Sequence, residues 1–251
     1  MKTSSIRHML VADLEGAVLG HADSLEGFRQ WATEERAYMT VVYFTRRAIP
    51  NPRQYVEHLS LPTPDFLIAA LASEIFDFAL DERVAKWERL TEVGWDAELV
   101  RRTIQSIGGM NVRFGERLSP HMVSVLLEDR SATTRSLLEN ALSREGMLVQ
   151  TNRNGDFLEI VPGSTDQLAA LQFLARQLRI PLPQVIACGG DESNSAVFYG
   201  SFSGVLVANS SIHVPTSLTS LNYRSPFAFA DGIIDGVQFW REKWASCAPG
   251  R

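Results

Sequence analysis

The sequence predicts an α/β fold, in which helices cover a parallel sheet and a separate α+β insert interrupts the core. Three observations favour this fold. Short apolar runs alternate with amphipathic helical segments in the first and last thirds, a pattern typical of parallel sheets buried on both faces. The middle third breaks the alternation, with two helices followed by a strand, a helix and a hairpin. The 251 residues, 45% of them hydrophobic, suffice for a core domain plus an insert.

The first third contains three predicted strands. They are HMLVAD at 8–13, YMTVVYFT at 38–45 and DFLIAA at 65–70. Residues 24–35 are predicted to form a helix with Ser24 as its N-cap, because a serine directly precedes the amphipathic run. A shorter helix is predicted at 53–59, and SEIFDFAL at 73–80 is predicted to form a hairpin beside the third strand.

The insert is predicted over about residues 81–158, which leaves 1–80 and 159–251 as the core. Two helices are expected within 81–108, a strand at HMVSVLLED and a helix at 131–145. The segment MLVQTNRNGDFLEIVP then predicts a hairpin, because Asn154-Gly155 suits a two-residue turn and apolar residues alternate on both sides.

The last third returns to the alternation of strand and helix. A helix follows VPGSTD, with Ser164, Thr165 or Asp166 as its N-cap. Its predicted apolar face consists of Leu168, Leu171, Ala175 and Leu178. QVIACGG at 184–190 and SGVLVAN at 203–209 are further predicted strands.

Composition excludes several classes of function. The net charge is −5 with both signs interspersed, so nucleic acid is not an expected partner. No apolar run approaches the ~20 residues that span a bilayer. Cys188 and Cys247 are expected to be reduced thiols, and we expect a soluble cytoplasmic protein. The sequence has no Gly-x-Ser-x-Gly elbow, no dinucleotide glycine fingerprint after the first strand and no zinc spacing.

Ligands of doubly wound sheets bind at the carboxyl ends of the strands, which directs attention to the loops at Asp13, Thr45, Ser164 and Cys188. A carboxylate placed like Asp13 can attack phosphorus, and Glu15 can serve as general acid. The alternative is a purely structural role, in which Asp13 caps a turn and Glu15 is a solvated loop charge.

The other loops carry groups suited to phosphate and metal. The Thr45 hydroxyl with Arg46 and Arg47 can hold a phosphate, or the arginines can be ordinary surface residues. The helix start near Ser164 can accept a phosphate, although an ordinary capped helix explains it as well. Asp191, Glu192 and Asn194 after Gly-Gly provide oxygen ligands of the kind that Mg²⁺ accepts.

Taken in order, these stretches resemble the haloacid dehalogenase (HAD) superfamily of phosphatases. The likeness is closer to the sucrose-phosphatase family and to the phosphatase-like C-terminal region of sucrose-phosphate synthases. It rests on IRHMLVADLEGAVLG, FTRRA, PDFLIAALASEIF, LEIVPGSTDQLAALQFLARQL, VIACGGDESN, GVLVANS and ADGIIDGVQF. The resemblance implies a Rossmann-like core with an inserted cap domain, and Mg²⁺-dependent removal of phosphate from sucrose 6-phosphate.

The resemblance also assigns roles to residues, with departures from the family pattern. Asp13 matches the nucleophile, and Glu15 replaces the aspartate that acts as acid/base. Thr45 and Arg47 match the Thr-Gly-Arg motif, but Arg46 replaces its glycine. The lysine expected after the cap is replaced by Gln167.

The metal motif and the substrate pocket complete the assignment. Mg²⁺ is expected on Asp13, Asp191 and Asn194, with Ser195 replacing the last aspartate; aligned without a gap, Gly190 and Asn194 replace both metal aspartates. Further substrate contacts are implied for Ser73, Glu74, the hairpin around Asn154, and Asn209.

Two hypotheses follow. The first is a sucrose-phosphatase-like protein with weak or absent hydrolysis, which binds a sugar phosphate or acts as partner to a sucrose-phosphate synthase. The second is an active Mg²⁺-dependent sucrose-6-phosphate phosphatase with Asp13 as nucleophile. The first is favoured, because losing a lysine and a metal carboxylate removes charge stabilisation on which phosphoryl transfer depends.

Overall fold

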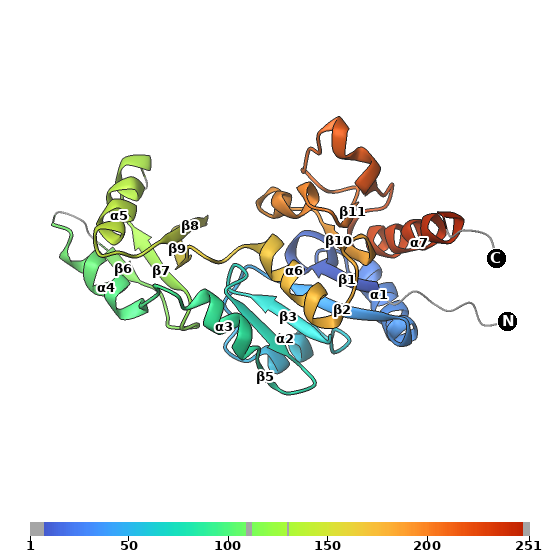
Figure 1. The fold of residues 1–251 in the computed structure, drawn as a ribbon, viewed down its shortest axis with the longest axis horizontal. Helices are drawn as coiled ribbons and strands as arrows, with labels where there is room; N and C mark the ends of the chain where they lie inside the picture. Colours follow the sequence, from blue (N-terminus) through green and yellow to red (C-terminus); the bar gives the residue numbers. More distant parts are fainter. Residues whose placement is uncertain (1–7, 109–111, 130, 248–251) are drawn as a thin grey trace.

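The computed structural model describes residues 8–108, 112–129 and 131–247. Figure 1 shows a core lobe built on a large sheet and a smaller cap lobe beside it. The core sheet has the order β12-β11-β10-β1-β2-β3-β4-β5. Its strands are β1 (His8–Asp13), β2 (Met39–Phe44), β3 (Phe66–Ala69), β4 (Glu74–Asp77), β5 (Glu82–Arg83), β10 (Val185–Gly189), β11 (Ser203–Leu206) and β12 (Asn222–Arg224). All pair in parallel except β4 and β5, which confirms the predicted α/β class and the hairpin beside β3.

The central strand β1 is buried on both faces, as its continuous apolar run predicts. Leu10 belongs to the apolar cluster of α1 (Ala22–Glu34), α2 (Pro52–His58) and α7 (Phe229–Cys247). Met9 and Val11 belong to the opposite cluster, with α3 (Ala85–Thr91) and α6 (Gln167–Leu178). Two helical layers therefore fix the strand that ends at Asp13.

The cap lobe is an antiparallel sheet in the order β6-β7-β9-β8. Its elements are α4 (Ala97–Ser106), β6 (Val112–Phe114), β7 (Val123–Leu127), α5 (Ala132–Arg144), β8 (Val149–Asn154) and β9 (Phe157–Pro162). The predicted hairpin is present, but Asn154 still pairs with Phe157, so the two-residue turn is Gly155-Asp156, one position later than predicted; Gly155 has φ +57°. Strand β5 belongs to the core sheet and β9 to the cap sheet, so the change of sheet falls a few residues beyond 81 and 158.

The predicted N-cap of the first helix is wrong. Helix α1 begins at Ala22, and the His21 ring accepts the hydrogen bond from the Ser24 amide at 3.3 Å. The Ser24 hydroxyl instead accepts from the Asp231 amide of α7 at 2.9 Å. A tertiary partner on α7 thus takes the side chain that local propensity assigns to capping.

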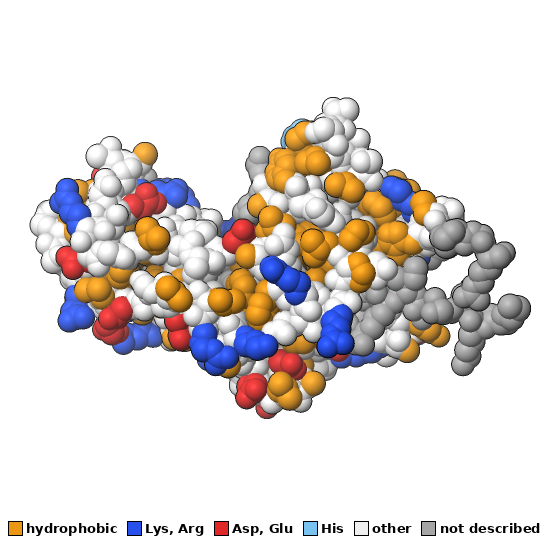
Figure 2. Space-filling model, in the orientation of Figure 1, with side chains coloured by type: hydrophobic (Ala, Val, Ile, Leu, Met, Phe, Trp, Pro, Cys, Tyr) orange, Lys and Arg blue, Asp and Glu red, His pale blue; other side chains and the backbone are white. Residues whose placement is uncertain are grey.

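Two short helices at the edge of the core were not predicted. A π-helical turn, η1 (Leu14–Val18), follows β1, and a 3₁₀ helix, η4 (Glu192–Tyr199), follows β10. Cys188 is buried and Cys247 exposed, both as free thiols. Within the described ranges, no helix combines the length and the apolar character needed to cross a bilayer. Figure 2 shows a hollow in the surface between the cap lobe and the residues that project after β11.

A buried polar cluster joins the two lobes. Glu74 of β4, only 3% exposed, accepts a hydrogen bond from the Ser119 hydroxyl of the cap at 2.5 Å. Its carboxylate also lies 3.6 Å from His121 Nδ1 and 3.4 Å from Arg83 Nε. His121 Nε2 in turn lies 3.2 Å from Glu92 Oε1. We call Glu74, Arg83, Glu92, Ser119 and His121 the junction cluster.

Contacts within the junction cluster shift the pKa values of Glu74 and His121 so that the charged form of each side chain is favoured. Burial alone would raise the pKa of Glu74, but the contacts with His121 and Ser119 and the charge of Arg83 outweigh it, so this pKa lies below its usual value. Burial alone would lower the pKa of His121, but Glu74 and Glu92 outweigh it, so this pKa is raised. Both groups are therefore charged together in the folded protein at mildly acidic pH.

Replacing Glu74 with glutamine is expected to lower the free energy of unfolding by about 1–3 kcal/mol, because His121 loses its buried counter-charge. The raised pKa of His121 contributes stability that is complete below its ordinary value of 6.5 and is lost as pH rises through the folded pKa. The lowered pKa of Glu74 contributes stability present above its ordinary 4.5 and lost as pH falls through the folded pKa. Urea unfolding measured across pH should therefore show the largest difference in stability between wild type and Glu74→Gln between pH 4.5 and pH 6.5.

A surface variant provides the control for this measurement. Glu26 pairs with Arg29 on α1 with its side chain 74% exposed, so Glu26→Gln should change stability by less than about 0.5 kcal/mol at any pH. A Glu74→Gln deficit that is constant from acid to alkaline pH would contradict the role assigned to the His121 charge.

Candidate functional site

The site is built where β1 ends and η1 begins. Asp13 is 4% exposed and precedes η1, yet its side chain makes no capping hydrogen bond there. The Asp13 side chain therefore does not cap η1. A Cβ at Gly16 would lie 2.2 Å from Asp13 Oδ2 and 3.0 Å from the Asp191 amide nitrogen. Only glycine allows the carboxylate and the loop after β10 to approach this turn so closely.

Glu15 is held by the residues that follow β2. Its Oε1 accepts a hydrogen bond from the Thr45 hydroxyl at 2.6 Å and lies 3.4 Å from Arg47 Nε. The Arg47 amide donates to the Thr45 hydroxyl oxygen at 3.2 Å. Glu15 is thus an anchored part of the site, and its longer side chain spans to the hydroxyl that we expect to meet phosphate.

Tyr55 of α2 also belongs to this group, although no sequence pattern predicted it. Burial raises its pKa above the ordinary 10, and the charge of Glu15 raises it further, while contact with Thr45 opposes the shift. The signal available in the sequence was weak, because a tyrosine ten positions after Thr45 matches no motif and only the packing of α2 brings it near.

Arg46 faces the carboxylate of Asp191. Its Nη1 lies 3.8 Å from Asp191 Oδ2, with the two side chains 22% and 45% exposed. The backbone around both arginines is held by the turn between β3 and β4, because the Ala70 amide donates to the Arg47 carbonyl at 2.8 Å and the Leu71 amide to the Arg46 carbonyl at 3.2 Å. Residues 70–72 all have positive φ, between 50° and 66°, which costs roughly 1–2 kcal/mol per residue outside glycine.

The predicted metal ligands only partly converge. Asp13 and Asp191 flank Gly16, but the side chain of Asn194 lies outside the described residues. Gly190 carries no ligand, and a Cβ there would lie 2.3 Å from the Gly16 carbonyl oxygen. Among the residues that the structure describes, no group of three His, Cys, Asp or Glu side chains could hold a metal ion. Of the residues expected to ligate Mg²⁺, Asp13 and Asp191 are the two that the described structure brings to this turn, which is fewer oxygen ligands than the octahedral set that Mg²⁺ takes.

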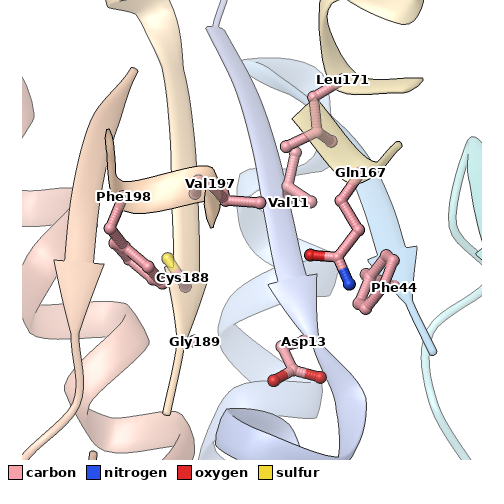
Figure 3. Close-up of a pocket in the computed structure, with 10 residues that line it drawn as sticks. Val11, Asp13, Phe44, Gln167, Leu171, Cys188, Gly189, Val197 and Phe198 are labelled. Atoms are coloured by element: carbon pink, nitrogen blue, oxygen red, sulfur yellow. The ribbon is translucent and has the colours of Figure 1, made fainter. Parts of the chain in front are cut away.

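Gln167 begins α6 and lies beside Asp13. Figure 3 shows its amide pointing toward the Asp13 carboxylate, with Phe44 next to it. Gln167, Asp13 and Phe44 line a small pocket whose other walls are apolar and come from β1, β10, α6 and η4. A neutral amide therefore stands where the resemblance places a lysine.

The remaining predicted residues are distributed around the site. Ser73 is buried and donates to the Ala70 carbonyl, while Glu74 lies in the junction cluster. Asn209 donates to the Gly16 carbonyl at 3.4 Å and accepts from the Phe229 amide at 2.7 Å. The α6 N-terminus holds its own carboxylate, since Asp166 accepts from the Leu168 amide at 2.9 Å. This cap confirms Asp166 among the predicted alternatives and favours an ordinary capped helix.

Several polar side chains of the cap hairpin share a face with Val161, together with Phe157. Asn152 and Asn154 donate to Glu159 at 3.3 and 2.7 Å, and Glu159 is buried. Val161 packs against Ala48 and Ala70 of the core lobe, so this face of the cap sheet is directed toward the core. The hairpin predicted to line the pocket therefore presents carboxamides on that side.

Comparisons with known proteins match almost the whole chain. A family model described as sucrose-6F-phosphate phosphohydrolase matches residues 6–241. Mannosylfructose-phosphate phosphatase of Agrobacterium fabrum is 25% identical over 238 residues, covering 92% of this chain and 96% of that protein. Sucrose-phosphatase 1 of Nicotiana tabacum is 26% identical over 218 residues, covering 82% of this chain and 51% of its own length. The chain thus spans about half the length of this plant relative.

Solved structures support the fold. The sucrose-phosphatase of Synechocystis sp. PCC6803, in complex with sucrose and phosphate, matches with a TM-score of 0.74 at 21% identity, covering 93% of this chain and 97% of that one. A haloacid dehalogenase-like hydrolase from Bacillus subtilis matches with a TM-score of 0.67 at 14% identity, covering 92% and 91% of the two chains.

Replacing Gly16 with alanine should disrupt the site, because the added Cβ would collide with the Asp13 carboxylate 2.2 Å away. We expect a loss of about 1–3 kcal/mol in the free energy of unfolding, the usual effect of overpacking. Gly27→Ala is the matched control, since its Cβ on α1 would meet only Asp231 Oδ1 at 4.0 Å. Urea denaturation should show that variant unchanged or up to about 1 kcal/mol more stable. Equal stability of Gly16→Ala and wild type would refute the close approach.

Proposed function

Since the chain belongs to the sucrose-6F-phosphate phosphohydrolase family of the HAD superfamily, we propose that it binds a sugar phosphate at the Asp13 site and hydrolyses it weakly or not at all. The proposal rests on one observation about the residues around Asp13, Glu15 and Thr45. Their neighbours are the Arg46 guanidinium, the neutral Gln167 amide and Gly190, which has no side chain. The site keeps groups that recognise phosphate and lacks groups that stabilise its transfer.

The expected loss of rate follows from the chemistry of phosphoryl transfer. Misplacing the general acid alone reduces rate by roughly 10²- to 10⁴-fold. Transfer depends on positioning and charge stabilisation, so a neutral residue at Gln167 and a missing metal carboxylate add comparable factors. These factors do not simply multiply, because the residues act as one unit. Hydrolysis slower by several orders of magnitude is the consistent outcome.

We assign the ligand to the phosphorylated disaccharides, with sucrose 6-phosphate or a similar fructose-containing sugar as the specific proposal. The names of the relatives, a mannosylfructose-phosphate phosphatase and a sucrose-phosphatase, support that class. Asn152, Asn154 and Glu159 on the core-directed face of the cap are suited to sugar hydroxyls, because carboxamides and carboxylates donate and accept hydrogen bonds.

Active hydrolysis is the second candidate, and one observation favours it. Glu15 is held 2.6 Å from the Thr45 hydroxyl on the same edge as Asp13, so a nucleophile and a proton donor remain side by side. Under this alternative Mg²⁺, which phosphatases of the superfamily generally use, would be held by Asp13 and Asp191 and would stabilise charge on the phosphoryl group. If instead the chain does not hydrolyse sugar phosphates, we propose that it acts as a partner of a sucrose-phosphate synthase.

Phosphate release from sucrose 6-phosphate separates the two candidates. With Mg²⁺ present, wild type is expected to release phosphate at least about 10³-fold more slowly than an active family member, because acid, lysine and metal carboxylate are all altered. Asp13→Asn, assayed side by side, should leave that low level unchanged. Release by wild type that vanishes in Asp13→Asn would establish the active alternative. If neither protein releases phosphate, titration with sucrose 6-phosphate and then with a synthase tests ligand and partner in turn.

Glu159→Gln is expected to weaken binding of sucrose 6-phosphate by roughly tenfold, since the glutamine cannot hold Asn152 and Asn154 as the carboxylate does. Binding of inorganic phosphate should stay the same, because the cap hairpin belongs to the other lobe. Isothermal titration with the two ligands measures the split. Glu145→Gln, at the exposed end of α5, is the control. Equal losses for both ligands would show that Glu159 matters for folding and not for the sugar.

A further inference from the structure

Two consecutive arginines, Arg46 and Arg47, lie at the edge of the site, and each has a guanidinium nitrogen near a carboxylate. Arg46 Nη1 lies 3.8 Å from Asp191 Oδ2, and Arg47 Nε lies 3.4 Å from Glu15 Oε1. Both separations exceed the 2.7–2.9 Å typical of a short charge-assisted hydrogen bond. A phosphate dianion that offers three oxygens can compete with these singly charged carboxylates for both guanidinium groups.

The backbone beneath the arginines is held in place before any ligand arrives. The carbonyl oxygens of Arg46 and Arg47 accept hydrogen bonds from Leu71 and Ala70 in the left-handed turn. Non-glycine residues with positive φ persist only where the surroundings determine them, and such turns concentrate at functional sites. Leu71 also packs with Met122 and Val161 of the cap, which fixes the turn from the other lobe. Both side chains therefore project from a rigid base, which favours binding.

A divalent cation is poorly suited to the same place. Gly190 provides no ligand, and any side chain there would press on the Gly16 carbonyl oxygen 2.3 Å from its Cβ. The Asp191 carboxylate is turned to Arg46, whose positive charge would repel a metal ion bound to that carboxylate. The described acidic, histidine and cysteine side chains form no group of three around the site. The strongest positive charge beside Asp191 is thus the guanidinium itself.

We propose that Arg46 supplies the positive charge that binds the phosphate group here in place of a divalent cation, so that the chain binds sugar phosphates without metal. The inference rests on the proposed function and adds its cation requirement. A planar guanidinium suits the task, because it can pair with two phosphate oxygens at once and stays charged at any accessible pH. Arg47 and the Thr45 hydroxyl complete the contact set on the other side of the phosphate.

The test is isothermal titration of inorganic phosphate and of sucrose 6-phosphate, each in excess EDTA and in millimolar Mg²⁺. Wild type should bind with dissociation constants that agree within about twofold between EDTA and Mg²⁺, and Arg46→Gln should bind at least roughly tenfold more weakly in both, as the loss of a charge-assisted pair predicts. Arg176→Gln is the matched control: this exposed arginine near the other end of α6 bonds only the Gln172 carbonyl among the hydrogen bonds described, and its removal should leave binding unchanged.

The outcomes separate this inference from the proposed function. Binding that needs Mg²⁺ and disappears in EDTA would overturn the inference and leave sugar-phosphate binding intact. Metal-independent binding that Arg46→Gln does not weaken would assign the charge elsewhere and also overturn it. No binding of sucrose 6-phosphate under either condition would refute the proposed function itself. The unfolding midpoint of ligand-free Arg46→Gln should match wild type within about 2 °C, because the pair with Asp191 is long, at 3.8 Å, and partly exposed.

Discussion

The site depends on the contact between two loops at the end of β1. Gly16 lets the Asp13 carboxylate fold back over η1, and Gly190 lets the loop after β10 lie on the Gly16 carbonyl. Asn209 donates to the same carbonyl and accepts from the start of α7, so a third segment holds the turn. Larger side chains at either glycine would force these segments apart. The position of Asp13 therefore depends on the two glycines, Gly16 and Gly190, as much as on strand β1.

The turn between β3 and β4 connects this edge to the cap. Its amides bond the carbonyls of Arg46 and Arg47, Leu71 packs on the cap residues Met122 and Val161, and Glu74 directly after it anchors the junction cluster. One short segment thus contacts both the two arginines of the candidate site and the base of the cap. A displacement of the cap is therefore expected to act on that turn, because packed elements transmit displacement through direct contact.

Those parts of the fold that depend on local pattern could be predicted from the sequence. The strand at 8–13 is buried on both faces, as its apolar run predicts, and the Asn-Gly signal predicted the cap hairpin, although its turn falls one residue later, at Gly155-Asp156. The left-handed turn at residues 70–72 escaped prediction because Ala-Leu-Ala carries no glycine signal, and η1 because π-helical turns have no sequence signature. In the site, Asp13, Glu15 and Thr45 lie together on the predicted edge, whereas Tyr55 enters through tertiary packing alone.

The altered residues of the site form a consistent set. Isolated losses from a catalytic site would leave charges facing one another without compensation, which destabilises a partly buried edge by several kcal/mol per uncompensated ion. Here Arg46, in the place of a glycine, meets Asp191, and the longer Glu15 reaches Thr45 and Arg47. Gln167 introduces no charge into the apolar pocket beside Asp13. Each guanidinium of the site thus faces a carboxylate in the ligand-free protein, and a phosphate dianion that binds there must compete with these two carboxylates for Arg46 and Arg47.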